Sequence, residues 1–475
     1  MIHKQIEGLF KGILSDNRLE KRTEKITNDM LTFGTAIVNR FGKNQAEKTG
    51  AYRMLSSQRI KYKEVSEGLY RDLENKQQYS HLLCIQDTSE INLSKHKELF
   101  DHNDSNLGQL TKKGNIGFYC HPMLVIEPTQ QIPLGFSSIE LYNRAWEQKN
   151  KHERKYQTLD IKHKESYRWI SSVTQTKKVL SDTPSLTIIG DRESDIYDEM
   201  VLVPDDKTNL LIRLTHNRNL YNSSDKLFDV LAASQQQTVF TLQVKSNRKR
   251  ENREALIAIR YVEVKIKRPS KLKVGHYPDY VKVWAIEARE LPESTPKDEN
   301  PILWRLLTTH QINSIEDAMT YIGWYKQRWF IEELFRVLKK QGLDIESSQL
   351  STGAAMKKLT VLALHVSLVT MLLKLALQSK QEYKSNIVFN AEQQKFLHLV
   401  NEEVQGKTQK QKNPYPVNTL AWAAWIIARL SGWSGYGSHG PAGYISLKRG
   451  LDRFNDKFVG FSIAMKHLNR DVYKE

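Results

Sequence analysis

Three acidic residues occupy positions from which a metal-dependent phosphoryl-transfer site can be built. Asp87 directly follows the apolar run LLCIQ, Asp191 directly follows LTIIG, and Glu332 lies in the segment YIGWYKQRWFIEELFRVLKK. Strand ends in open sheets are where side chains from distant parts of a chain converge. Converging carboxylates repel one another unless cations separate them, and hard oxygen ligands favour Mg²⁺ or Mn²⁺. We therefore predict two such ions, roughly 3.5 to 4 Å apart, at a phosphoryl-transfer site.

Helical geometry selects Glu332 over its neighbour Glu333. If the segment is one helix at about 100° per residue, then Tyr325, Arg328, Glu332 and Lys339 share one narrow polar stripe. Glu333 falls off that stripe, and the apolar residues cluster on the opposite side. The stripe fits either an ordinary solvated face with ion pairs or a row of groups that acts on a substrate.

Rival acids surround Asp191 in DRESDIYDEM. Glu193, Asp195 and Asp198 are expected in the first turn of a helix, where acidic side chains stabilise the positive end. Asp191 immediately follows the apolar strand, and for this reason we choose it.

The charge of the chain favours a nucleic-acid partner. Lys and Arg number 71 against 54 Asp and Glu, a net charge of +17. A basic tail, a membrane-surface helix or simple solubility would give the same sum, so the distribution matters more. Basic residues are concentrated in residues 1–80 and 245–273, which indicates phosphate-binding surfaces, although the second region also fits a charged hairpin tip.

Other features argue against metal-thiolate, membrane and nucleotide sites. Cys84 and Cys120 lie in apolar runs without metal-type spacing and are expected to be buried, reduced thiols. The apolar stretch at 359–373 is short for a membrane span and contains His365, so a buried helix is expected. The glycine-rich stretch at 431–444 lacks a Lys-Ser or Lys-Thr and is expected to be a loop, with no nucleotide cofactor. With no signal-peptide pattern, we expect a cytoplasmic protein with no membrane partner.

The elements that position these residues change character along the chain. Residues 1–78 have a helical pattern, and residues 79–345 alternate strands and helices, which suits a mixed α/β sheet flanked by helices. A β-rich insertion is expected at about 217–310, and residues 346–475 are again helical.

Tyr325, Arg328, Glu332 and Lys339 match the Tyr-x₂-Arg-x₃-Glu-x₆-Lys signature of the insertion-sequence-four family of bacterial DDE transposases. QDTS at 86–89 and DRESDI at 191–196 resemble the segments around that family's two catalytic aspartates. GAYR at 50–53 is similar to its N-terminal DNA-binding region, and AWAAWIIARLSGW at 421–433 to its C-terminal dimerisation region. These matches occur in the same order over nearly the whole chain.

The resemblance implies an RNase H-like (retroviral integrase-like) catalytic core in which Asp87, Asp191 and Glu332 bind two Mg²⁺ or Mn²⁺ ions. It implies cut-and-paste transposition on the bacterial nucleoid. Water nicks each transposon end, the freed 3′-hydroxyl forms a DNA hairpin, the hairpin is hydrolysed, and the ends join target DNA. Residues 1–78 would bind the end repeats of double-stranded DNA, and residues 346–475 would form a homodimer, helped by the apolar helix around Trp422 and Trp425.

The resemblance also implies DNA contacts. Tyr325, Arg328 and Lys339 would contact phosphates near the cleaved end. Trp304 would stack on a flipped base, although it also fits plain strand core. The further candidates are basic residues that could bind phosphates: Arg22, Arg40, Lys43, Arg53, Arg213, Arg248, Lys249, Arg250 and Arg253.

Two alternatives stay open at this point. A DNA-binding regulator or inhibitor of transposition would bind DNA without cleavage, and the intact acidic residues count against it. A two-metal DNA nuclease would cut without joining, and a strand-transfer assay separates it from a transposase.

Overall fold

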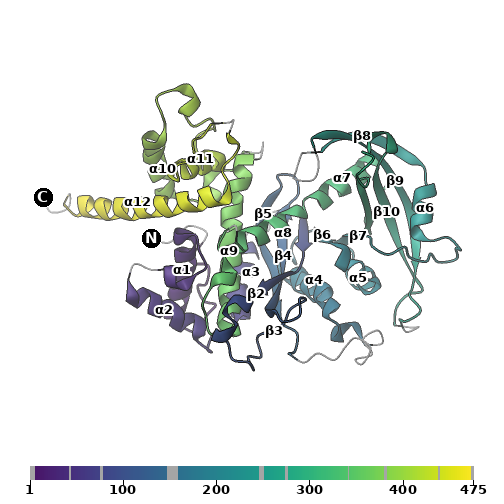
Figure 1. The fold of residues 1–475 in the computed structure, drawn as a ribbon, viewed down its shortest axis with the longest axis horizontal. Coiled ribbons are helices and arrows are strands. Elements are labelled where there is room, and N and C mark those ends of the chain that lie inside the picture. The colour runs from purple at the N-terminus through teal and green to yellow at the C-terminus, as the bar shows by residue number, and fades with distance from the viewer. Residues whose placement is uncertain are drawn as a thin grey trace.

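The computed structural model describes residues 6–41, 44–74, 79–146, 159–244, 251–272, 276–340, 342–378, 382–436 and 439–471. The N-terminal helices are α1 (Asn17–Phe33), α2 (Gln45–Ser56) and α3 (Tyr62–Glu74). The Asp16 side chain caps α1, and Gly34 ends it in the left-handed conformation that glycine adopts without strain. Helix α1 packs against the C-terminal helices α9 and α12, so the two ends of the chain meet on one side of the molecule (Figure 1).

One sheet runs through the described chain in the order β2-β4-β1-β6-β7-β11-β10-β9-β8, with β3 and β5 also paired to β4. The central strands β1 (His81–Gln86), β6 (Ser185–Gly190) and β7 (Thr208–Arg213) are parallel. The flanking strands are β2 (Ser89–Asn92), β3 (Gly108–Gln109), β4 (Ile116–Glu127) and β5 (Ile132–Tyr142). Strands β1 and β6 are continuous buried runs, as expected where both faces of a parallel sheet are covered. The predicted mixed α/β architecture is confirmed.

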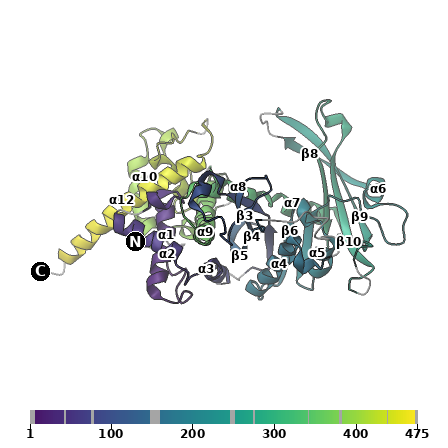
Figure 2. The same ribbon diagram turned by 60° about the horizontal axis from the view of Figure 1, so that its bottom comes forward.

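The strand-rich segment after β7 extends this same sheet. It contains α6 (Leu227–Ala233), β8 (Gln236–Val244), β9 (Arg253–Lys267), β10 (Tyr280–Glu290) and β11 (Leu303–Thr308). Strand β11 joins it to the core, because it pairs antiparallel with β7 in the register Leu307 to Ile212. Figure 2 shows β8, β9 and β10 on the side of the molecule away from the C-terminal helices.

Helices make up most of the remaining chain. They are α4 (Arg168–Val179), α5 (Tyr197–Leu202), α7 (Ile315–Lys326), α8 (Trp329–Leu338), α9 (Gly353–Gln378), α10 (Ala391–Val404), α11 (Leu420–Leu430) and α12 (Tyr444–Asp471). Helix α9 extends beyond the predicted apolar run and is long enough to cross a membrane, but 89% of its most apolar window is buried by protein. It packs against α1, α3, α8, α11 and α12, as the core of the helical part.

Helix α11 corrects one argument for dimerisation. Trp422 and Trp425 are each 1% exposed, and the helix packs against α9, α10 and α12 of its own chain. Its apolar sequence therefore reflects an internal core position. It offers no apolar face to a second subunit.

Candidate active site

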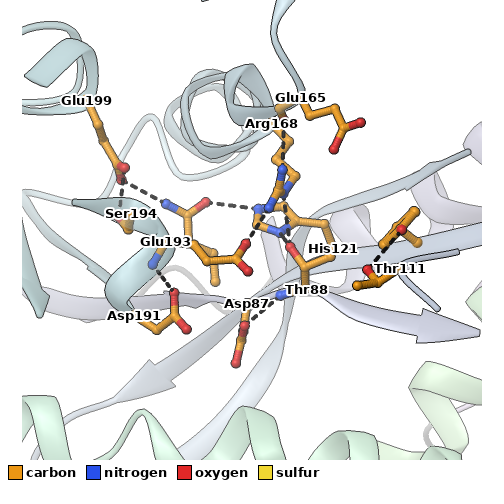
Figure 3. A network of polar contacts seen from close by, with 12 residues as sticks. Asp87, Thr88, Thr111, His121, Glu165, Arg168, Asp191, Glu193, Ser194 and Glu199 are labelled. Atoms are coloured by element: carbon orange, nitrogen blue, oxygen red, sulfur yellow. Dashed lines mark hydrogen bonds and ion pairs between the residues drawn. The ribbon is translucent and has the colours of Figure 1, made fainter. Parts of the chain in front are cut away.

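The register of two parallel strands brings Asp87 and Asp191 together. Ile85 of β1 pairs with Ile189 of β6, and each aspartate lies two residues further on, at the same carboxyl edge of the sheet. The Oδ1 atom of Asp87 accepts a hydrogen bond from the backbone N–H of Thr88 at 2.7 Å. Asp191 Oδ1 accepts one from the backbone N–H of Glu193 at 2.8 Å. Figure 3 shows both carboxylates pointing to the same side of the sheet edge.

Arg328 connects the third acid to this edge. Its guanidinium forms an ion pair with Asp87 Oδ2 at 3.4 Å and a second ion pair with Glu332 on α8. The structure therefore brings Asp87, Asp191 and Glu332 to one region. Glu333, in contrast, is buried and accepts hydrogen bonds from Lys374 on α9 and Tyr444 on α12.

The charge of this region is incompletely balanced. Burial, and then the negative charges of Asp191 and Glu332, raise the pKa of Asp87 to about 7, although the Thr88 N–H and Arg328 oppose this shift. Such crowding is relieved by a cation. Three carboxylates form a hard oxygen donor set that fits Mg²⁺ or Mn²⁺.

The side chains as they stand are not arranged around a single ion. Within the described ranges, no three His, Cys, Asp or Glu side chains are grouped closely enough to hold a metal. Arg328 supplies the positive charge between Asp87 and Glu332 in this arrangement. Metal binding would thus require Arg328 to move away from at least one of these two carboxylates.

The expectation of one uninterrupted helix at 321–340 is wrong. Helix α7 ends at Lys326 and α8 begins at Trp329. The joint is tightened by bonds between residues three apart, from the N–H of Gln327 to the carbonyl of Trp324 and from Arg328 to Tyr325, each 3.0 Å. Because a tighter turn rotates more per residue, the side chains no longer follow a 100° rule.

A consequence of the joint is that the predicted stripe is not a uniform solvated face. Tyr325 is 4% exposed, and its ring lies edge-on to that of Trp304 with centroids 5.8 Å apart. The Arg213 and Arg328 guanidinium groups are close enough to oppose the rise that burial causes in the Tyr325 pKa. Trp304 is half-buried on β11.

The other predicted DNA contacts have different environments. Lys339 lies just after α8, 3.8 Å from Glu346. Arg40 and Arg53 are exposed on the N-terminal part, whereas Arg22 is half-buried and lies against Gly50. Lys43, Arg248, Lys249 and Arg250 lie outside the described residues.

Arg253 does not have the environment expected of a phosphate clamp. Its guanidinium forms ion pairs with Glu290, whose side chain is fully buried, and with Glu299 at 3.2 Å. It also donates to the carbonyl of Ser294. Arg253 therefore holds β9 to β10 and the loop after it, and a DNA contact of this residue stays a prediction that would have to compete with these ion pairs.

Sequence patterns missed a polar network behind the aspartates. Its members are Gln86, Thr88, His121, Arg168, Glu193, Ser194 and Glu199. Gln86 and Thr88 flank Asp87, so their position beside a predicted acid was the available signal. Nothing in the spacing of His121 or Arg168 marked them, because their partners lie far away in the sequence.

One comparison with known proteins bears on this geometry. Residues 146–369 match the family model described as the transposase DDE domain. The matched range includes Asp191 and Glu332 and begins after Asp87. It also spans the strands β6, β7 and β11 and the helices α7 and α8, which carry most of the region described above. The chain therefore carries a transposase DDE domain, the domain of a metal-dependent enzyme that cleaves DNA and transfers strands.

Proposed function

We propose that the chain is a cut-and-paste transposase of the insertion-sequence-four family, similar to the transposase of transposon five. It binds the inverted repeats at transposon ends as a homodimer, cleaves them through a DNA hairpin and joins them to target DNA on the bacterial nucleoid. The observation that carries this proposal is the adjacency of Asp87 and Asp191, with Glu332 joined to them through Arg328. The order of parallel and antiparallel strands around β1 supports an RNase H-like core.

Asp87, Asp191 and Glu332 would hold the two divalent ions. When bound, such a pair activates the attacking oxygen and stabilises the leaving oxygen of a phosphodiester. The three carboxylates repel one another without a cation, and this repulsion favours uptake of one. Burial first, and then this repulsion, raise the pKa of Asp87.

Arg328 has two roles in this proposal. In the free protein its single positive charge pairs with both Asp87 and Glu332. Once cations replace it there, its fork of N–H donors becomes available to a DNA phosphate, for which guanidinium geometry is well suited. Arg213, Tyr325 and Lys339 would hold the DNA backbone on either side of the cleaved bond.

Trp304 would receive the extruded base at the hairpin. Extrusion costs a few kcal/mol, and stacking on an aromatic ring returns about 1 to 3 kcal/mol. The edge-on contact with Tyr325 fixes one side of the Trp304 ring and keeps it next to the phosphate-binding groups.

The test uses the purified full-length chain and a supercoiled plasmid that carries the DNA flanking the reading frame on both sides. With Mg²⁺ we expect excision between inverted repeats, hairpin-capped ends visible on denaturing gels, and joined products after target plasmid is added. Cutting without joining would instead identify a two-metal nuclease. Binding without cutting would identify a regulator, and either result would overturn the proposal.

A further inference from the structure

Arg168, the first residue of α4, contacts both loops that carry the aspartates. Its Nε donates to Thr88 Oγ1 at 3.0 Å, and its Nη2 donates to Glu193 Oε2 at 2.6 Å. Thr88 follows Asp87 directly, and Glu193 lies two residues after Asp191. A third donor, Nη1, bonds the Glu165 carbonyl at 2.9 Å and anchors the guanidinium to its own segment (Figure 3).

A second chain of hydrogen bonds connects the same two loops deeper in the protein. Thr88 Oγ1 lies 2.8 Å from His121 Nδ1, and His121 Nε2 lies 3.2 Å from Gln86 Oε1. The Gln86 amide donates to Glu199 Oε1 at 3.2 Å, and Ser194 Oγ donates to Glu199 Oε2 at 2.7 Å. Because Ser194 follows Glu193, the two connections close into a ring, hereafter the polar ring.

One set of hydrogen-bond directions satisfies every group of the polar ring. In this set the Thr88 hydroxyl accepts from Arg168 and donates its single proton to His121 Nδ1. The proton of the neutral imidazole is then on Nε2 and is donated to Gln86 Oε1, which turns the Gln86 amide nitrogen toward Glu199. Burial lowers the pKa of His121 well below its usual value, in agreement with this neutral form.

The polar ring leaves the two aspartate carboxylates outside it. Each carboxylate is oriented instead by a backbone N–H of a ring residue, Thr88 for Asp87 and Glu193 for Asp191. Any shift of Thr88 relative to Glu193 is therefore passed to the spacing of the two carboxylates. Gln86, His121 and Glu199 are buried, so a broken link would leave polar groups without water as a replacement partner.

We propose that Arg168 is a positioning residue that sets the spacing between Asp87 and Asp191, and thereby the affinity of the site for divalent cations. This inference rests on the proposed function of those two aspartates. The guanidinium bonds in three directions at once. A lysine at the same position keeps the charge but, as a compact point donor, does not span the two loops.

The test measures binding of Mn²⁺ alone to the full-length chain, from the electron paramagnetic resonance signal of the free ion. Outer-shell partners of metal ligands typically contribute about 10- to 100-fold in metal affinity, and we expect a loss in this range for Arg168→Lys. Arg268→Lys is the matched control. Like Arg168, Arg268 is largely buried, donates to a backbone carbonyl, that of Leu272 at 2.6 Å, and forms an ion pair with an exposed carboxylate, that of Asp279 at 3.1 Å. Neither of these partners belongs to an aspartate loop. The Mn²⁺ affinity of this control should equal that of the unmodified chain.

A second variant separates the loss of positioning from misfolding of the chain. The Glu193 side chain is 65% exposed, so Glu193→Gln removes the ion pair to Arg168 with little effect on folding, and weaker Mn²⁺ binding is again expected. Unchanged binding in a folded Arg168→Lys chain, or in Glu193→Gln, would overturn the positioning role while Asp87→Ala still abolishes binding. If Asp87→Ala binds Mn²⁺ normally, the metal site itself is wrong and the positioning role fails with it.

Discussion

Glu332 and Glu333 are neighbours on α8 but belong to two very different regions. On the Glu332 side, facing the strand ends, the carboxylates outnumber the cations and the pKa of Asp87 is raised to about 7. On the Glu333 side, facing α9 and α12, burial would raise the pKa of Glu333, but hydrogen bonds from Lys374 and Tyr444 bring it below its ordinary value. The second region neutralises itself and is structural. In the first the carboxylates exceed the cations, and we expect it to bind a cation from outside.

The largest effect should come from removing one acid of the region at the strand ends, hereafter the strand-end region, which contains Asp87, Asp191 and Glu332. We expect Asp191→Ala or Glu332→Ala to reduce DNA cleavage by about three orders of magnitude or more, because a lost ligand removes several kcal/mol of transition-state stabilisation. DNA binding in a gel-shift assay should remain. Cleavage that survives either change would show that these acids are not needed for the reaction.

Removing Glu333 should affect stability instead. Lys374 lies 2.9 Å from Glu333 and would be left with an uncompensated, largely buried charge in Glu333→Ala. Breaking such a pair typically costs about 3 to 5 kcal/mol, which urea unfolding should show. Glu332→Gln is the matched control on the same helix and should unfold close to the unmodified chain. Equal losses of stability for both variants would show that Glu332 is as important for folding as Glu333.

The raised pKa of Asp87 should also make the stability of the folded chain depend on pH. Since the folded-state pKa of Asp87 is raised to about 7, the folded protein binds more protons than the unfolded chain between the ordinary aspartate pKa and that value. Stability from this group is therefore present at low pH and lost as the pH rises through about 7. Asp87→Asn should raise the Tm at pH 8 and change it little at pH 4. A larger gain at pH 4 than at pH 8 would contradict the sign of this shift.

The smallest effect is expected at the aromatic side of the strand-end region. Trp304→Ala should slow hairpin formation by about 5- to 150-fold, the equivalent of roughly 1 to 3 kcal/mol of base stacking, and leave first-strand nicking unchanged. Trp304→Phe keeps an aromatic face and should recover much of the rate. Equal slowing of nicking and hairpin formation would assign Trp304 to strand packing alone.

Local patterns in the sequence predicted the fold class because hydrophobic periodicity is a local property. The buried runs before Asp87 and Asp191 form the strands β1 and β6, and these two strands pair in parallel. The joint at Gln327 and Arg328 was not predictable in this way, since the segment contains no proline or glycine there. Its contacts are tertiary, such as the bond from the Gln327 amide to the Pro128 carbonyl.

The remaining misses share the same physical origin. Arg253 looked like a free basic residue because its partners, Glu290 and Glu299, are distant in the sequence. The polar ring was invisible for the same reason. Charge signs along a chain indicate where cations are, but only the folded neighbourhood shows whether they are already neutralised.

The most direct test of metal binding by Asp87, Asp191 and Glu332 is the anomalous scattering of Mn²⁺ in crystals of the full-length chain. We expect manganese peaks among Asp87, Asp191 and Glu332, with the Arg328 guanidinium withdrawn from at least one of its two carboxylates. Manganese bound elsewhere, with Arg328 still joining Asp87 to Glu332, would contradict the account.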